Sequence, residues 1–93
     1  MFGIKNDSEA GQVQYMESLT RTLLSALVDH PNDLKLHTSV GTGLIMVEAT
    51  PAKGDSGYLI GRGGKTADAL RTILTNIAVR EGKRFVLSIN DGE

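Results

Sequence analysis

The sequence predicts one α+β domain with the element order helix, strand, strand, short helix, glycine loop, helix, strand. Three patterns support this prediction. Apolar residues recur every three or four positions over residues 12–29 and again from residue 65, which is the period of a helix with one buried stripe. Residues 34–40 alternate apolar and polar side chains, as a half-buried strand does. Glycines gather in GYLIGRGGKT, residues 57–66, and 93 residues suffice for one modest core.

The first half of the chain is predicted to form a helix and a β-hairpin. The helix over residues 12–29 ends at the cluster HPND, because Pro31 cannot continue it. Residues 34–40 form the first strand, with Leu34, Leu36, Thr38 and Val40 facing inward. GTG at residues 41–43 is the turn, because glycine supplies the positive φ that a tight hairpin needs. The apolar run LIMVEAT, residues 44–50, is the second strand. Residues 1–11 are polar and without period, so we expect them to be frayed and the folded domain to span residues 12–90.

The second half is predicted to form two helices around the glycine loop and a final strand. Ser56, with Asp55 before it, can cap a short helix over residues 57–60. A long helix begins near Lys65, and Gly82 ends it in the left-handed conformation that a helix terminus favours. KRFVLSI then reads as a strand, residues 83–89. The long helix is expected to bury Ala67, Leu70, Ile73, Leu74 and Ile77.

Composition excludes several classes of function. The chain has no cysteine, so it has no disulfide, thiolate zinc site or cysteine nucleophile. No apolar run approaches the roughly 20 residues of a membrane span, and the first residues lack the order of a signal peptide, so we expect a cytoplasmic protein. His30 lies at a helix end and His37 points outward from a strand, which does not make a metal pair. We therefore expect no enzyme, no metal, no cofactor and no small-molecule substrate.

The charge is unevenly distributed along the chain. Residues 1–52 carry three cations against six carboxylates, and residues 53–90 carry seven cations against three. The positive charge therefore gathers around the glycine loop and the segment after it, which is the local field that attracts polyanions even when the whole chain has a formal charge of -1.

The glycine loop does not match the nucleotide-binding patterns that it first suggests. Gly64-Lys65-Thr66 is the second half of a P-loop, but that motif requires glycine five places earlier, where Leu59 stands. The dinucleotide fingerprint fails as well, because Thr66 occupies its third glycine position. What remains is G-x-x-G at residues 61–64, between two helices. Such a turn lets a sugar-phosphate backbone pass close to it, beside a helix N-terminus that favours phosphate. The ligand implied is a polymer. An apolar groove of Ile60, Ala67, Leu70 and part of the last strand is expected beside the loop for unstacked bases.

The segment LIGRGGKTADALRTIL resembles the signature of the K-homology (KH) domain, in which such a loop clamps about four nucleotides. The helix and strand that precede the core resemble the type II, prokaryotic arrangement, with a three-stranded sheet packed against three helices. ALVDHPNDLKL, GYLIGRGGKTADALRTIL and REGKRFVLSI together are similar to the small bacterial single-KH proteins of the KhpA type, over residues 16–89. This resemblance implies non-catalytic RNA binding and pairing, as a homodimer or with a larger KH protein of the Jag/KhpB type.

The resemblance assigns roles to residues of the loop. Gly61 and Gly64 take the two fixed glycine positions, and Arg62 supplies the cation usual in the variable pair. Gly63 departs from the more common polar or basic residue, and Thr66 stands where relatives often have an aliphatic side chain. The RNA-binding residues are then expected to be Ile60, Gly61, Arg62, Gly63, Gly64, Lys65, Thr66, Ala67, Leu70, Arg71, Lys83 and Arg84.

One alternative of another class stays open. The chain can be a protein-interaction module, in which the groove or the first helix binds a partner and the loop is vestigial. Salt-dependent binding to nucleic acid distinguishes the two.

Overall fold

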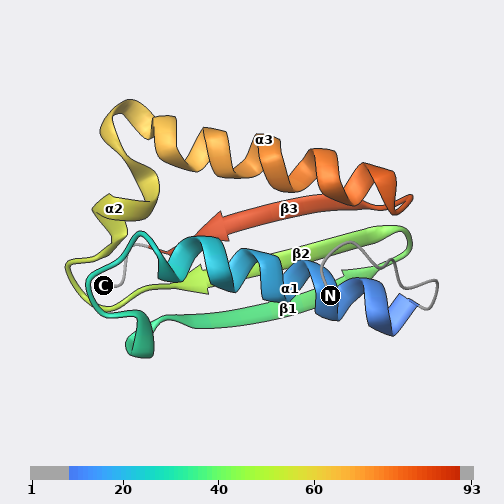
Figure 1. The fold of residues 1–93 in the computed structure, drawn as a ribbon, viewed down its shortest axis with the longest axis horizontal. Helices are drawn as coiled ribbons and strands as arrows, with labels where there is room; N and C mark the ends of the chain where they lie inside the picture. The colour runs from blue at the N-terminus through green and yellow to red at the C-terminus, as the bar shows by residue number, and fades with distance from the viewer. Residues whose placement is uncertain (1–8, 91–93) are drawn as a thin grey trace.

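The computed structural model describes residues 9–90 and confirms the α+β class and the predicted order of elements (Figure 1). The helices are α1 (Glu9–Ser25), α2 (Ser56–Ile60) and α3 (Lys65–Arg80), with short 3₁₀ turns η1 (Pro31–Asp33) and η2 (Arg62–Gly64). The strands are β1 (Lys35–Gly41), β2 (Leu44–Thr50) and β3 (Arg84–Ile89). Within the described residues no helix is long and apolar enough to cross a membrane.

The three strands form one mixed sheet in the order β1-β2-β3. β1 and β2 are antiparallel and joined by a tight turn in which Gly43 has φ 65°. β3 pairs with β2 in parallel, because α3 carries the chain back along the sheet before β3 begins. Gly82, with φ 76°, ends the turn after α3 as predicted. Both glycine turns are therefore confirmed.

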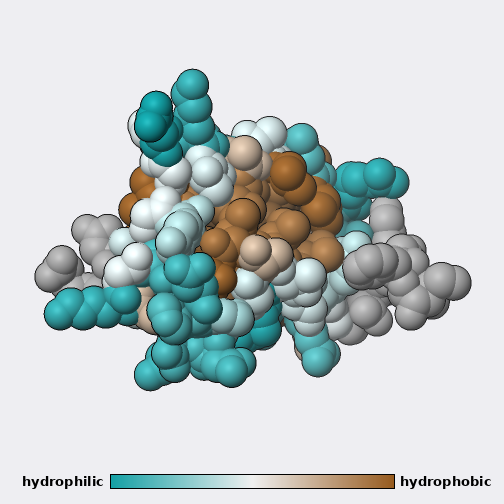
Figure 2. All heavy atoms as spheres, turned by 60° about the vertical axis from the view of Figure 1, so that its left-hand side comes forward, coloured by the Kyte–Doolittle hydropathy of each residue, from teal (hydrophilic) through white to brown (hydrophobic). Residues whose placement is uncertain are grey.

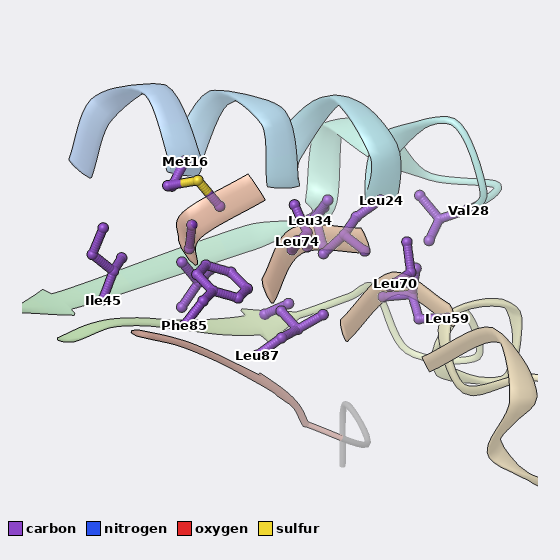
Figure 3. Close-up of a cluster of buried hydrophobic side chains, with 13 residues drawn as sticks. Met16, Leu24, Val28, Leu34, Ile45, Leu59, Leu70, Leu74, Phe85 and Leu87 are labelled. Atoms are coloured by element: carbon purple, nitrogen blue, oxygen red, sulfur yellow. The ribbon is translucent and has the colours of Figure 1, made fainter. Parts of the chain in front are cut away.

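The core lies between one face of the sheet and the two long helices (Figure 3). In β2 and β3 it takes the odd-numbered residues, as the period of two requires. Leu24 of α1 and Leu74 of α3 are completely buried against this face. Each such leucine stabilises the fold by about 1.5–3 kcal/mol through burial alone. The core residues are Met16, Leu24, Val28, Leu34, Ile45, Val47, Ala49, Leu59, Leu70, Leu74, Ala78, Phe85 and Leu87.

The first helix differs from the prediction at both ends. α1 begins at Glu9, so the helix includes residues 9–11, which the prediction placed before it; residues 1–8 lie outside the described part of the chain. Side chains of the first turn reach the far end of α3, where Gln12 Nε2 donates to the carbonyl of Glu81 at 3.2 Å. Apolar period alone could not reveal these polar contacts. α1 also ends at Ser25, before the predicted residue 29, and a turn containing Leu27 follows.

Two side chains that were predicted to be buried are exposed. Ile73 is 49% exposed because the buried stripe of α3 runs through Ala67, Leu70, Leu74 and Ala78, which leaves Ile73 at its margin. Val40 is 50% exposed near the hairpin turn, where it lines an open groove of about 580 Å³ with the first turns of α1. Ser56 is the first residue of α2 and not its cap.

Candidate nucleic-acid interface

The glycine loop is a sharp connection between α2 and α3 (Figure 1). Gly61 ends α2 with φ 77° and ψ 171°, a backbone conformation that is essentially restricted to glycine. Gly63 (φ 64°, ψ 18°) and Gly64 (φ 79°, ψ 9°) are both left-handed. Three glycines with positive φ within four residues turn the chain and start α3 at Lys65.

The glycines of the loop differ in the space that surrounds them. A Cβ on Gly61 would collide with the side chain of Thr66 and would lie 2.8 Å from the Thr66 backbone nitrogen. The hydrogen at Gly61 is therefore required by the protein chain itself. A Cβ on Gly63 or Gly64 would meet no atom within 4 Å, so the backbone at these two residues faces open space. Within the loop, these two residues leave room for another backbone to approach.

Two cations flank this open backbone. Arg62 and Lys65 are exposed, and neither forms an ion pair with any residue in the range 9–90. Both lie at the N-terminus of α3, where the aligned peptide dipoles of 16 residues add partial positive charge. The start of α3 is thus an electropositive, sterically open end of a helix.

Arg71 has a structural contact as well as a free surface. Its Nε donates a hydrogen bond to the carbonyl of Leu87 in β3 at 3.1 Å, and its Nη1 lies 3.6 Å from a carboxylate oxygen of Asp68. The Arg71 side chain stays 45% exposed. It therefore ties α3 to the free edge of the sheet while presenting part of its guanidinium group to solvent.

The apolar residues expected to form a groove contribute less surface than predicted. Ala67 is 3% exposed and Leu70 is 6% exposed, and Leu70 belongs to the core. Ile60 is half-buried and Thr66 packs against Gly61. Ala67 and Leu70 therefore support the start of α3 from below, and the expectation that they line an open groove is corrected.

Lys83 and Arg84 are not brought to the loop. They follow the C-terminal end of α3, and 16 residues of helix separate that end from the loop by about 24 Å. Lys83 is also largely covered and lies 3.9 Å from a carboxylate oxygen of Glu9. The charge pattern placed these cations in one basic segment, but the direction of α3 separates them in space.

Sequence patterns did not identify Tyr58 of α2 and Asp55, the N-cap residue of α2, as parts of this region. The Tyr58 hydroxyl donates to Asp29 Oδ2 at 3.0 Å, and this hydrogen bond to a carboxylate raises the pKa of Tyr58. Asp55 is 2% exposed, and its carboxylate contacts His30. The signal in the sequence, an aspartate before a short helix, was interpreted as a helix cap because that is its commonest use.

A mixed three-stranded sheet, helices on one face and a Gly-x-x-Gly turn between α2 and α3 define a KH domain of type II. A family model described as KhpA/KhpB, KH domain, matches residues 17–89, and the chain belongs to this family. The family is non-catalytic, in agreement with the expectation that the chain is not an enzyme.

Relatives in three bacteria support the assignment. The chain is 38% identical over 74 residues to an RNA-binding protein KhpA of Chlamydia muridarum, covering 80% of this chain and 95% of the relative. It is 36% identical over 74 residues to the protein of the same name from Clostridium acetobutylicum, covering 80% and 99%. With that of Lactiplantibacillus plantarum it shares 35% identity over 78 residues, covering 84% and 92%.

Proposed function

We propose that this chain binds single-stranded RNA at the glycine loop, without catalysis, and clamps about four nucleotides there. The observation that carries the proposal is the open backbone at Gly63 and Gly64, at the N-terminus of α3, between two cations without ion pairs. The relatives' name, RNA-binding protein KhpA, supports the same ligand.

The contacts follow from the geometry of the loop. The sugar-phosphate backbone passes over Gly63 and Gly64, with its phosphates toward Arg62, Lys65 and the first amides of α3. Bases lie toward Ile60 and the α3 side of β3, where Arg71 is exposed. The chain holds only two tyrosines and two phenylalanines, so stacking on rings contributes little. Direct contacts of Lys83 and Arg84 require RNA that extends beyond the clamp.

The cellular role that fits this site is post-transcriptional regulation or RNA chaperoning in the cytoplasm. One clamp on about four nucleotides binds weakly, and two linked clamps raise the effective concentration of the second site. We therefore include pairing in the proposal, as a homodimer or with a Jag/KhpB-type KH protein.

Exposed apolar surface on the helical side supports the proposal of pairing. Figure 2 shows hydrophobic side chains gathered in one patch with a hydrophilic border. On α3, Ile73 is 49% exposed and Ile77 is half-buried, and Leu27, which follows α1, is 40% exposed. Isolated exposed apolar side chains are ordinary, but a contiguous patch on a small domain is typical of a protein contact.

The experiment is a titration of a labelled single-stranded RNA pool of random sequence with wild type, Arg62→Glu and Arg21→Glu. Arg21→Glu changes the net charge by the same amount as Arg62→Glu, but at an exposed residue of α1. We expect Arg62→Glu to weaken binding at least about tenfold, as the loss of a charge-assisted contact does. The affinity of Arg21→Glu should stay near that of wild type.

The second candidate function is protein interaction alone, and the same apolar patch favours it. If the wild-type chain fails to bind the RNA pool even at low salt, or if Arg62→Glu binds as well as Arg21→Glu, RNA clamping at the loop is refuted and the interaction module becomes the better account.

A further inference from the structure

Asp55 is the only charged residue in the range 9–90 that is buried. It precedes α2, the helix that leads directly into the glycine loop, and it is 2% exposed. A carboxylate in such a position loses its hydration, which is unfavourable for folding. Its negative charge beside an RNA-binding loop also opposes the approach of phosphate. Because both effects are unfavourable, we expect a contact of Asp55 that offsets them.

The carboxylate of Asp55 does not serve α2 as a cap. It makes no hydrogen bond to the first amides of that helix. Its Oδ2 accepts a hydrogen bond at 2.9 Å from the backbone N–H of His30, which lies 25 positions earlier in the sequence. The His30 Nδ1 lies 3.3 Å from the same oxygen and 3.4 Å from Oδ1. The carboxylate oxygens of Asp55 therefore contact His30, at the junction between α1 and η1.

A second contact joins the same two segments. Tyr58 of α2 donates to Asp29, the neighbour of His30, at 3.0 Å. Two adjacent residues after α1 therefore hold the N-cap and the third residue of α2. The Tyr58 contact is exposed, whereas the hydrogen bonds of Asp55 to His30 are partly buried, so water competes less with the hydrogen bonds of Asp55.

α2 depends on such contacts for its orientation. A helix of five residues is too short to be stable alone. Leu59 is the one fully buried side chain of α2 and anchors it to the core, while the other four residues of the helix are half-buried or exposed. Hydrogen bonds at the N-terminal end of α2 therefore add to the packing that fixes its orientation. Asp55 lies six positions before Gly61, about 9 Å along the helix axis. A shift at Asp55 therefore moves the glycine loop.

We propose that Asp55 is a positioning residue for the glycine loop, which orients α2 through its hydrogen bonds to His30. The inference rests on the RNA-binding function proposed above. It predicts the direction in which a substitution of Asp55 changes RNA affinity. Removing a negative charge near an RNA site strengthens binding if only electrostatics matter, whereas loss of positioning weakens it.

The test compares Asp55→Ala and Asp55→Asn with Asp33→Ala, using a labelled single-stranded RNA pool of random sequence at a temperature where circular dichroism shows each variant folded. Asp33→Ala removes the same negative charge as Asp55→Ala, but from an exposed residue of η1. We expect Asp55→Ala to bind about tenfold more weakly than wild type, equivalent to about 1.4 kcal/mol. Asp55→Asn keeps an oxygen that can accept from His30 and should lose about threefold. Asp33→Ala should bind as well as wild type or slightly better.

Amide hydrogen exchange separates positioning from general stability. Asp55→Ala should speed exchange at His30 and at the loop amides of Gly61 and Gly64, which donate to Gly57 and Gly61 at 2.9 and 3.1 Å. Exchange at Arg84, whose amide donates to Gly43 across the sheet, should not change. A merely structural role would instead speed exchange at all four amides and leave the RNA affinity of the folded fraction unchanged.

The result that overturns the inference is a folded Asp55→Ala variant that binds RNA as tightly as Asp33→Ala. If Asp55→Ala does not fold, Asp55→Asn decides: weaker binding with unchanged exchange at Arg84 supports positioning, and equal binding refutes it. Failure of the wild type to bind the RNA pool refutes the proposed function instead. The exchange comparison needs no RNA and still shows whether Asp55 holds the loop.

Discussion

At the scale of single residues, the glycine loop combines two kinds of glycine. Gly61 adopts a backbone conformation that is essentially restricted to glycine, and its hydrogen faces Thr66. Gly63 and Gly64 are left-handed but surrounded by open space. The first glycine therefore builds the loop, and the other two leave it open to a ligand.

Alanine substitutions should separate these two roles. Gly61→Ala adds backbone strain of about 1–3 kcal/mol and a collision with Thr66, so we expect a loss of roughly 2–5 kcal/mol in the free energy of unfolding. Gly63→Ala adds only a left-handed alanine, at about 1–2 kcal/mol. Urea denaturation of both variants measures the difference. Equal losses would contradict the assignment of a structural role to Gly61 alone.

At the scale of elements, α3 has two different ends. Its N-terminus carries Lys65 beside the open loop, and its C-terminus carries Arg80 before the turn at Gly82. Both side chains are exposed cations. The helix places them about 22 Å apart, so we expect the proposed clamp on about four nucleotides at the loop to reach Lys65 and not Arg80.

The salt dependence of RNA binding should distinguish the two ends. Each phosphate contact with single-stranded nucleic acid contributes about 0.7 to the slope of log K against log salt concentration. Lys65→Ala should weaken binding to different RNA sequences about equally and reduce the slope by about 0.7 to 1. Arg80→Ala is the matched control and should leave the slope unchanged. An intact slope in Lys65→Ala would mean that Lys65 is only a solvated cation.

At the scale of the whole molecule, the proposed RNA site lies at the N-terminus of α3, and the exposed apolar side chain of Ile73 lies further along the same helix. The proposed pairing joins two weak clamps without any new RNA contact, because linkage raises the effective concentration of the second clamp. Ile73 is the most exposed isoleucine of α3, and it was predicted to be buried. The exposure of Ile73 is the structural observation that most supports the proposal of pairing.

Replacing Ile73 should therefore change the mass in solution more than the stability. We expect light scattering of the wild type to give a mass above the 9.9 kDa of one chain, rising with concentration. Ile73→Glu should return the mass to one chain with a small change in unfolding free energy, since the side chain is 49% exposed. Val79→Glu is the control, because Val79 is 60% exposed on the same helix. A constant 9.9 kDa for the wild type would exclude the homodimer and leave only a heterologous partner.

Local patterns of the sequence were sufficient for the elements and for the position of the loop. Period, turn glycines and Pro31 act over a few residues. Over residues 9–90 they correctly predicted three strands, three α-helices and the turns at Gly43 and Gly82. The G-x-x-G loop, with its flanking segments, was also sufficient to identify the family that the comparisons confirm.

Tertiary structure decided which of these residues meet. The direction of α3 carried Lys83 away from the loop, and the packing of its stripe Ala67, Leu70, Leu74 and Ala78 left Ile73 exposed. Packing buried Ala67, and folding brought Asp55 to His30 across 25 positions. Sequence patterns determine local conformation because it depends on near neighbours, whereas exposure and long-range hydrogen bonds depend on how the elements pack against one another.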